Sequence, residues 1–577
     1  MNSGIRSFFS NLRKKRIIEI LAAFIAGGWL VIEFVDRILV AHYHFPDKTI
    51  DIAFITLLCA LICTLLWRWF SGREEPRKFK LELVLIPLVV LITVLLDINL
   101  LLHLKGPEAE TIPTSKWKHS IAVLPFVDMS PQKDQEYFCD GITENLINRL
   151  SNINELRVPA RTSAFMFKGK TPDMHEVGER LKVQTVLEGS IQKSGSQLRI
   201  TAQLINIADG YHLWSDTYDR ELKDVFSIQD EIALEIIDKL KIKLLGEERA
   251  RVVKRYTDNT EAYDSYMRGM WLVNNKSTEG DWRKAILHFE RAVEIDPNFS
   301  LAYVELAGAY MTLSLWHFVS TDEVLPKAKE ALEHALKIDP GLPEALALSG
   351  RIKFHFEYDW IGGESDIKKA LEVNPNDGSA HVGMARILLN KGQIDKAVEE
   401  NKAFLEFDPL SIVTQGVSAF VLYSAGRYDD AIKLCQKSLE LESEYWLTLA
   451  TLGLCYVQKS EFEEAIAALQ KAVSISGNST EPLSYLAYAY VVSGNREKGI
   501  EILREMDKLS EHTYVTKYYL ASVQAALGDK DKAFESLELA YKERDGDLTG
   551  LKTDPKFAVL RSDPRYEMML KKIGLEK

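Results

Sequence analysis

Cysteine is scarce in this chain, with five residues among 577, and their positions exclude two common uses of this side chain. Cys59 and Cys63 lie in an apolar segment, whereas Cys139, Cys435 and Cys455 are scattered through the remainder. The sequence holds no Cys-x-x-Cys pair and no zinc-ligand spacing. We therefore expect neither a disulfide framework nor a structural zinc site.

Positive charge is in short supply outside the first hundred residues. The formal net charge of the chain is −12. Residues 1–105 hold 13 Lys+Arg against 9 Asp+Glu, and the remaining residues hold 58 against 74. A region this acidic lacks the basic face that binding to a phosphate backbone requires. Nucleic acid is therefore not an expected partner.

The sequence also lacks any set of residues that catalysis would require. The string Gly-Lys-Thr at 169–171 is similar to part of a phosphate loop, but Ala164 stands where that loop needs glycine. Cys139 has no evident His or Asn partner, and His42 and His44 would leave a metal ion without a third ligand. Paired carboxylates in a glycine-framed loop and a nucleophile with its base are not found. We predict that the chain is not an enzyme and holds no cofactor and no metal.

Long apolar stretches, in contrast, are present near the start of the chain. Residues 17–40, 52–70 and 83–104 each come close to the roughly 20 residues that a bilayer crossing needs. The first stretch follows the cations Arg13–Arg16 and has no small-residue cleavage site, so it differs from a secretory signal. Residues 1–105 are therefore predicted to form a membrane region of three transmembrane helices in contact with the lipid bilayer.

The distribution of positive charge predicts the orientation of these helices. Cations precede the first stretch and gather between the second and the third, whereas the loop between the first and second contains only Lys48. The positive-inside bias then places the N-terminus in the cytoplasm and the residues after about 105 on the other side. This predicts a bacterial inner-membrane protein whose later part is periplasmic; if one stretch fails to span, that part lies in the cytoplasm.

Charged residues within the apolar stretches are candidates for function, because they are costly in a membrane. Glu33 and Arg37 have the i, i+4 spacing of an ion pair, and Asp97 lies deeper in the third stretch. Our preferred hypothesis is a polar pair between Arg37 and Asp97 that holds the helices together, and a proton or ion path is the alternative. The small residues Ala22 and Ala26 would also allow self-association of the helices.

Residues 120–245, which follow a linker at 106–119, have the pattern of a compact α/β domain. The continuous apolar run Ile121–Phe126 is typical of a strand buried on both faces. Asp173 and Glu176 have capping-box spacing before a short helix. Apolar and polar residues then alternate along LRITAQLI, which predicts a hairpin strand with one buried face. A helix that carries Ile228, Ile232, Ile236 and Leu240 on one side closes the domain.

Several strings in this region resemble the TolB amino-terminal-like domain nearly motif for motif: VLPF, DGITENLINRLS, VLEGS, LRITAQLI and FSIQDEIA. That domain is found in membrane-bound regulators and in adenylate-cyclase-related proteins, commonly followed by tetratricopeptide repeats. The resemblance implies a periplasmic domain of a sensory or regulatory protein. In such relatives a cyclase or winged-helix module precedes the membrane segment, whereas only about 16 residues do so here, so neither module is expected.

The last part of the chain is repetitive. The strings EIDP, KIDP, EVNP and EFDP place Pro297, Pro340, Pro375 and Pro409 at intervals of 43, 35 and 34 residues. A 34-residue period of paired helices is the signature of tetratricopeptide repeats (TPR). We predict about eight repeats over residues 260–548 and a C-terminal cap over 549–577. The predicted fold class is thus multidomain, with transmembrane α-helices, an α/β (TolB-N-like) domain and an all-α TPR superhelix.

Stacked repeats of this kind present a concave surface made by the first helix of each pair. Helical spacing predicts that the partner-binding groove includes Arg386, Phe420, Tyr423, Leu454, Tyr488 and Tyr518. Apolar and aromatic side chains in such a groove suit an extended or helical peptide. The alternative is that several of these side chains belong to the core. Cys435 and Cys455 fall in adjacent helices and are expected to be buried thiols.

The function predicted from these observations is a membrane-anchored interaction or sensory scaffold that binds a protein or peptide partner and catalyses no reaction. The alternative is a regulatory component of a nucleotide-cyclase or transcriptional signalling pathway, or an enzyme of that family. The sequence does not name the partner, the stimulus or the oligomeric state.

Overall fold

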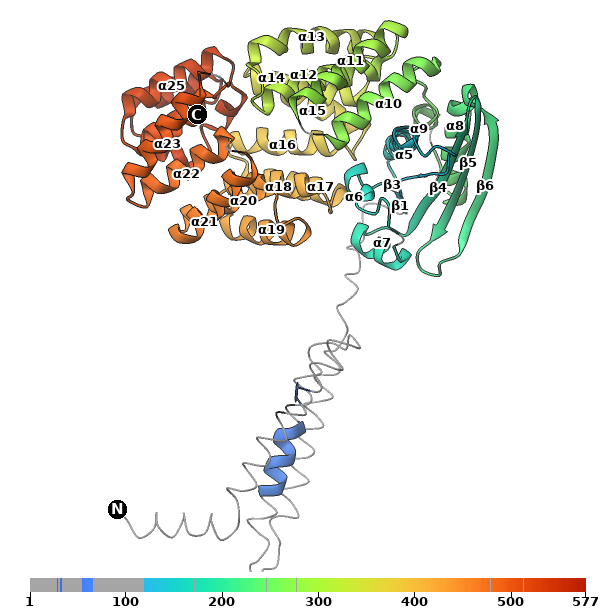
Figure 1. The fold of residues 1–577 in the computed structure, drawn as a ribbon, viewed down its shortest axis with the longest axis horizontal. Coiled ribbons are helices and arrows are strands. Elements are labelled where there is room, and N and C mark those ends of the chain that lie inside the picture. The colour runs from blue at the N-terminus through green and yellow to red at the C-terminus, as the bar shows by residue number, and fades with distance from the viewer. Residues whose placement is uncertain are drawn as a thin grey trace, which may run out of the picture. The chain divides into compact units, whose positions relative to one another are not determined.

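The computed structural model describes residues 119–576 apart from 171, 245, 277, 478 and 512, together with residues 29, 32–33, 54 and 56–65. The chain divides into two compact units, Met1–Ser115 and Lys116–Lys577. The second unit holds an α/β domain and a long array of paired helices (Figure 1).

The predicted transmembrane helices fall almost entirely outside the described residues, as do Arg37 and Asp97. Where residues are described, no helix combines the length and the apolar character that a membrane crossing requires. The transmembrane part of the predicted fold class and the inner-membrane, periplasmic location are therefore wrong.

The α/β domain is built on a mixed sheet of six strands in the order β3-β1-β4-β5-β6, with β2 beside β4. The strands are β1 (His119–Val123), β2 (Val127–Asp128), β3 (Leu156–Arg157), β4 (Thr185–Ser194), β5 (Gln197–Asn206) and β6 (His212–Glu221). Strand β1 is parallel to both β3 and β4, whereas β4, β5 and β6 form an antiparallel meander. The predicted hairpin is therefore β4–β5.

The helices of this domain cover both faces of the sheet. They are α5 (Glu136–Ser151), α6 (Arg161–Phe165), α7 (Met174–Leu181), α8 (Val225–Lys239) and α9 (Gly246–Val252), with the short 3-10 helix η2 (Leu222–Asp224). Ile121 and Val123 pack into the core with α5 and α8, whereas Ala122 between them packs against α7. All three side chains are fully buried, which confirms the strand with two covered faces. The Asp173 carboxylate caps α7 by accepting the amide of His175.

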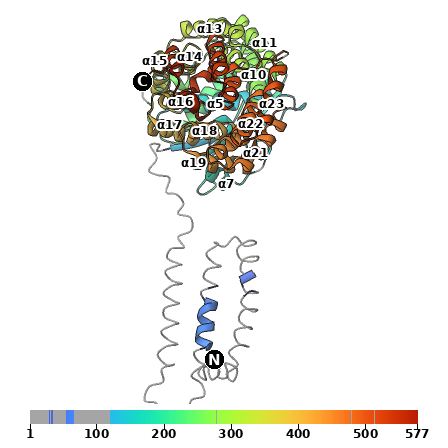
Figure 2. The same ribbon diagram turned by 90° about the vertical axis from the view of Figure 1, so that its left-hand side faces the viewer.

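Sixteen described helices between residues 260 and 542 pack as consecutive pairs. They are α10 (Thr260–Asn275), α11 (Glu279–Ile295), α12 (Ser300–Leu315), α13 (Thr321–Ile338), α14 (Pro343–Phe356), α15 (Trp360–Val373), α16 (Gly378–Asn390), α17 (Ile394–Phe407), α18 (Ile412–Ser424), α19 (Tyr428–Leu441), α20 (Trp446–Gln458), α21 (Phe462–Ile475), α22 (Thr480–Val492), α23 (Arg496–Leu509), α24 (Lys517–Ala526) and α25 (Lys530–Lys542). The 3-10 helices η3 (Gly546–Gly550) and η4 (Pro555–Leu560) and helix α26 (Pro564–Lys572) follow. The array curves, so that α13 and α19 lie at opposite edges in two perpendicular views (Figures 1 and 2).

Close packing within each pair comes from small residues at fixed positions. A Cβ added at Gly453 of α20 would lie 2.5 Å from the Leu469 side chain of α21. Ala431, Ala465 and Ala533, which recur at the 34-residue period, are fully buried. The period read from the sequence is therefore the period at which helix backbones approach each other closely.

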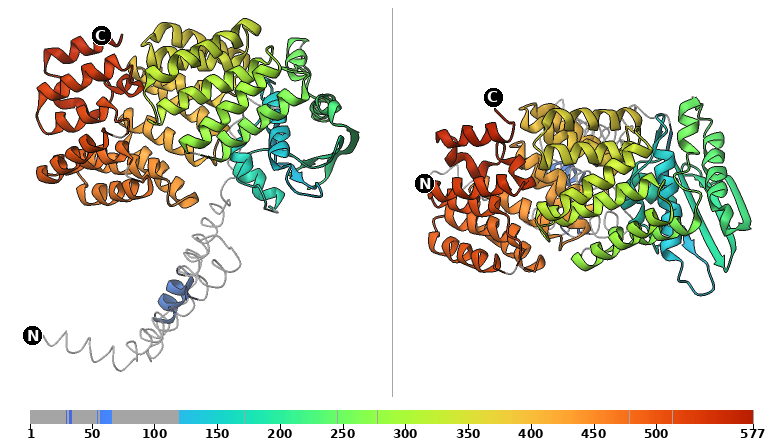
Figure 3. Two further views of the ribbon diagram at one scale, coloured as in Figure 1. Left: turned by 45° about the horizontal axis from the view of Figure 1, so that its top comes forward. Right: turned by 90° about the horizontal axis from the view of Figure 1, so that it is seen from above.

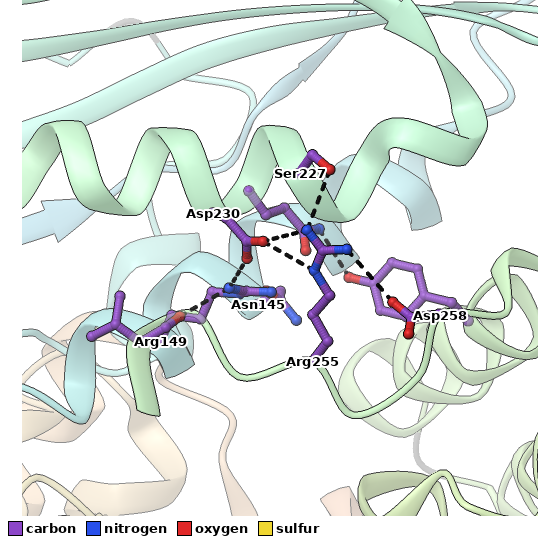
Figure 4. A network of polar contacts seen from close by, with 9 residues as sticks. Asn145, Arg149, Ser227, Asp230, Arg255 and Asp258 are labelled. Carbon is purple, nitrogen blue, oxygen red and sulfur yellow. Dashed lines mark hydrogen bonds and ion pairs between the residues drawn. The ribbon is translucent and has the colours of Figure 1, made fainter. Parts of the chain in front are cut away.

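The α/β domain is joined to the first helix pair through a network of charged groups (Figure 4). The Asp230 carboxylate of α8 accepts hydrogen bonds from Arg149 of α5 at 2.6 Å and from Arg255 at 2.6 Å, on opposite oxygens. Arg149 also donates to the carbonyl of Val252 at 2.9 Å. Because Arg255 lies in the segment that leads into α10, this network fixes the path of the chain from the α/β domain into the repeats.

A second attachment lies more than 150 residues further along the chain, at the loop between α17 and α18. The Asp408 carboxylate accepts hydrogen bonds from Thr162 and Ser163 of α6 at 2.6 and 2.7 Å. The Ala160 amide donates to the carbonyl of Phe407 at 2.7 Å. Leu410 completes the small core formed by α7 and the sheet. Figures 1 and 3 accordingly show α6 beside the end of α17.

The loops between these two attachments also touch the α/β domain or its exit segment. Asp296 accepts from the Thr257 hydroxyl and Asp339 from the Lys254 ammonium, both at 2.5 Å. The Asn376 amide donates to the carbonyl of Ser151 at 2.8 Å. One edge of the first five helix pairs is thus bound to the α/β domain by four successive loops.

The end of the chain packs back on the third helix pair. The indole of Trp360 donates to the carbonyl of Ile573 at 2.6 Å, and the Tyr358 hydroxyl donates to the carbonyl of Asp545 at 3.2 Å. In the second pair, His317 lies 3.2 Å from the Tyr519 hydroxyl. These contacts join residues about 200 positions apart and make the curved array close on itself.

Candidate protein-interaction site

One side-chain position recurs on the first helix of successive pairs, eleven residues after each proline of the Asp/Asn-Pro strings. It is occupied by Gly308 on α12, Arg351 on α14, Arg386 on α16 and Phe420 on α18. Each of these residues lines a pocket in the interior of the curved array. We call this row the inner row. Its members are brought together because the repeat period places them at the same point of each helix.

The first interior pocket, beside Gly308, has a volume of about 140 Å³. Its walls are mostly apolar and come from three helices, α10, α12 and α14: Val273, Ala309, Met311, Leu315 and Leu348. Glu305 and Arg351 supply the charged part of the lining, and Trp282 closes one side. The indole nitrogen of Trp282 is buried and has no hydrogen-bond partner among the described residues. We call this pocket the glycine pocket.

The second interior pocket lies between α16, α18, α22, α24 and the segment after α25. Arg386, Phe420 and Tyr518 line it together with the carboxylates Asp547 and Asp554. The Tyr518 hydroxyl donates to Asp554 at 2.8 Å. We call it the aromatic pocket. It combines ring surface with charge, as grooves that hold peptide side chains do.

Three of the six predicted groove residues therefore meet in one pocket, namely Arg386, Phe420 and Tyr518. The other three lie elsewhere: Tyr423 and Leu454 are fully buried, and Tyr488 is 8% exposed. The sequence prediction did not include Arg351, which stands 35 residues before Arg386 and could have been found from the same period.

The two arginines of the inner row have unusual surroundings. Within the described part of the chain, neither guanidinium lies within 4.0 Å of a carboxylate oxygen. The buried Arg149, in contrast, pairs with Asp230, and the buried Arg157 donates to three backbone carbonyls. Arg351 donates only to the Ser379 hydroxyl at 3.2 Å, and Arg386 donates to Nε2 of His355 at 3.0 Å. Burial lowers the pKa of both arginines, and the charge of Arg386 lowers that of Arg351 further.

Two carboxyl groups near the glycine pocket have a raised pKa and keep their protons to higher pH than exposed glutamates do. Burial, together with the neighbouring Glu144 and Glu344, raises the pKa of Glu305 to about 8. Burial likewise raises the pKa of Glu344 to about 7, with Asp377 and Asp339 as further causes. At neutral pH the negative charge around the pocket is therefore smaller than the number of carboxyl groups suggests.

The remaining candidate sites of the sequence are not assembled. Burial raises the pKa of the Cys139 thiol, which is opposite to the shift that activates a thiol. Cys435 and Cys455 are buried free thiols. In the described residues no group of three or more His, Cys, Asp or Glu side chains could hold a metal ion. His42, His44 and the Arg37–Asp97 pair lie outside the described residues.

Comparison with known families identifies the parts of the second unit. Two family models described as tetratricopeptide repeat match residues 367–399 and 411–477. The chain carries tetratricopeptide repeats. A third model, described as HilA/YgeH-like transcriptional regulator, second domain, matches residues 117–235. The TolB-like nature of residues 120–245 stays a prediction beside this match.

Two curated proteins are similar to parts of the chain. "Putative adenylate cyclase 3" of Rhizobium meliloti (strain 1021) is 39% identical over 249 residues, which are 42% of this chain and 42% of that protein. "Transcriptional regulator HilA" of Salmonella paratyphi A (strain ATCC 9150 / SARB42) is 23% identical over 296 residues, which are 50% of this chain and 51% of that protein. The chain thus spans about half the length of these relatives, or less.

Solved structures of helical-repeat proteins are also similar to the chain. The crystal structure of yeast Tom70 covers 61% of this chain and 82% of its own, at 16% identity and a TM-score of 0.35. The crystal structure of YrrB, described as a TPR protein with an unusual peptide-binding site, covers 34% of this chain and 95% of its own, at 17% identity and a TM-score of 0.24.

Proposed function

We propose that the chain is an interaction scaffold whose repeats bind a peptide segment of a protein partner in the interior pockets, and that it catalyses no reaction. The observation that carries this proposal is the aromatic pocket. There Phe420 and Tyr518 supply ring surface, and Arg386 supplies a charge that no carboxylate neutralises by direct contact. Binding energy in such sites comes mainly from a few large side chains that fill a pocket.

The rest of the fold supports a binding role by making this site rigid. The edge of the first five helix pairs is bound to the α/β domain or its exit segment, and the end of the chain packs on the third pair. A groove held at both edges loses little conformational entropy when a partner binds. The α/β domain then serves as a fixed support of the repeats, and its exposed surface is available for a second contact.

The test is selection of a random linear peptide library displayed on phage against the immobilised full chain, followed by measured affinities of the selected peptides. We expect Phe420→Ala to weaken binding at least tenfold, because it removes ring surface from the pocket. Ile361→Ala is the matched control, since Ile361 is 82% exposed on α15 and lines neither pocket. If no peptide survives selection, or if Phe420→Ala binds as well as the unchanged chain, peptide binding in this pocket is refuted.

A role in signalling is the second candidate, and the relatives favour it, because one carries the name of a cyclase and the other that of a transcriptional regulator. In this candidate the scaffold presents its peptide partner to a signalling enzyme. Incubation of the purified chain with ATP and a divalent metal ion should yield no cyclic AMP. Turnover above that of a heat-denatured sample would show instead that the chain is itself an enzyme.

A further inference from the structure

The side chains of the inner row differ in size and charge along the groove, and these differences indicate what kind of ligand would fit. Gly308 leaves an open space, Arg351 and Arg386 follow with two positive charges, and Phe420 adds a ring. A ligand that lies along these helices therefore contacts the apolar glycine pocket and, next to it, the two positively charged arginines.

Gly308 has open space around it and is not a glycine that close packing against a neighbouring side chain requires. A Cβ built on Gly308 would meet no atom within 4 Å, whereas one built on Gly269 or Gly350 would collide with a neighbouring side chain. The glycine pocket of about 140 Å³ is close in size to the roughly 150 Å³ apolar cavities that stay dry and take up a benzene ring. It therefore has room for one apolar side chain.

Neither arginine of the pair forms an ion pair among the described residues, although Asp547 acts on Arg386 and Asp377 acts on Arg351 without direct contact. Desolvation and mutual repulsion disfavour the two charges, and their hydrogen bonds go to a hydroxyl and to a neutral imidazole. A carboxylate would accept paired hydrogen bonds from a guanidinium and offset this cost. A negatively charged oxygen group on a ligand is thus electrostatically complementary to Arg351 and Arg386.

The acidic groups nearby do not cancel this preference. Glu305 lines the glycine pocket, and its carboxyl group is mostly protonated at neutral pH because its pKa is raised to about 8. Glu144 of α5 and Glu344 of α14 face it, and burial raises the pKa of each as well. Asp377 raises the pKa of Arg351 and Asp547 raises that of Arg386, but among the described residues neither carboxylate forms an ion pair with these arginines.

We propose that the groove selects peptide segments in which an apolar residue and an acidic residue lie close together, the apolar side chain filling the glycine pocket and the carboxylate binding Arg351 and Arg386. This inference rests on the proposed function and specifies the ligand of the same groove. Phe420 and Tyr518 then contact the residues that follow the acidic one.

The experiment uses the selected peptides and three variants of the full chain. Gly308→Leu fills the glycine pocket, and the open space and the helical backbone allow the new side chain without strain. The matched control is Gly280→Leu, since Gly280 is an exposed glycine of α11 that also has open space around it. The double variant Arg351→Gln, Arg386→Gln removes both charges while keeping a polar side chain that can donate hydrogen bonds at each position.

We expect the selected peptides to share an apolar residue within a few positions of Asp or Glu. Gly308→Leu and the double arginine variant should each weaken binding more than tenfold, and Gly280→Leu should not change it. Replacing the acidic residue of the peptide by its amide should weaken binding to the unchanged chain but have little further effect on the double variant.

Three outcomes would overturn the inference. Selected peptides could lack the acidic residue, or Gly308→Leu could bind them as tightly as Gly280→Leu does. Millimolar inorganic phosphate could raise the melting temperature of the unchanged chain, but not of the double variant, while no acidic peptide binds; the arginines would then serve a free oxyanion. Peptides that bind without the pattern contradict only this inference, whereas the survival of no peptide contradicts the proposed function.

Discussion

Asp408→Ala should detach the α/β domain from the middle of the repeats. The Asp408 carboxylate is 6% exposed and accepts three hydroxyl hydrogen bonds, from Thr162, Ser163 and Thr414, at 2.6, 2.7 and 2.5 Å. Two of these hydroxyls belong to the α/β domain and one to the repeats. The substitution removes the shared acceptor and leaves the buried hydroxyl groups of Ser163 and Thr414 without it.

The expected cost follows from the nature of these bonds. A hydrogen bond to a charged acceptor contributes about 1.5–3 kcal/mol, and removing one partner of a buried charged group costs about 3–5 kcal/mol in total, since the individual terms do not add. We therefore expect Asp408→Ala to lower the free energy of unfolding by about 3–5 kcal/mol. A milder variant, Ser163→Ala, removes one bond to Asp408 and the acceptor of the Leu410 amide, and should cost about 1–3 kcal/mol.

The measurement is urea unfolding combined with hydrogen exchange, because a chain of this size need not unfold in one step. Exchange resolves the local effect: the amides of Ala160 and Leu410, which bond across the attachment, should exchange about a hundredfold faster if the local opening becomes easier by about 3 kcal/mol. Amides in α20 and α22 should not change.

Glu442→Ala is the matched control for this substitution. Glu442 ends α19 as Asp408 ends α17, but it is exposed, and among the described residues its loop forms no hydrogen bond or ion pair with the α/β domain. Its loss should change stability by no more than about 0.5 kcal/mol. If the two variants lose the same stability, and Ala160 keeps its slow exchange in both, Asp408 does not hold the two parts together.

Two further predictions concern packing and protonation. Gly453→Ala brings a methyl group to 2.5 Å from Leu469 and should lower the free energy of unfolding by about 1–3 kcal/mol. Gly308→Ala places a methyl group in open space on a helix and should raise the free energy of unfolding by about 0.5–1 kcal/mol. The two variants should therefore shift the melting temperature in opposite directions, and equal shifts would contradict both predictions. The pKa of Glu305 is raised from 4.5 to about 8, so its contribution to stability is complete below pH 4.5 and declines as the pH rises through 8, by at most about 1.4 kcal/mol per pH unit. Glu305→Gln should remove this contribution in urea unfolding at several pH values, while Glu372→Gln, on the exposed side of α15, should keep it.

Local features of the fold could be predicted because local sequence determines them. The capping of α7 by Asp173 and the alternating strand β5 each depend on residues that are neighbours in the chain. The repeat period was readable because the same small residues return every 34 positions. In each case the physical cause lies within about ten residues or is repeated many times.

Contacts between distant residues could not be predicted in this way. The guanidinium of Arg157 donates to the carbonyl of Glu406, 249 residues away, and no local pattern indicates such a partner. Helical spacing gave the face on which Tyr423 and Leu454 lie, but not what covers them, and both are fully buried. The prediction of membrane-spanning helices was also wrong, because among the described residues no helix is both long and apolar enough to cross a membrane.

The Asp/Asn-Pro strings mark more than the period. The polar residues of their loops bind the α/β domain or its exit segment in each of four successive repeats, from Asp296 to Asp408, and the next loop, at Glu442, has neither the proline nor the contact. The inner row from Gly308 to Phe420 lies in the repeats that begin with these four loops. The α/β domain therefore fixes the spacing of the helices that line the proposed groove. A peptide that binds this groove tightly must then also favour the docked state, because coupling between two equilibria is reciprocal. Bound peptide should slow the hydrogen exchange of the Ala160 amide, and Asp408→Ala should weaken peptide binding although Asp408 lines neither pocket.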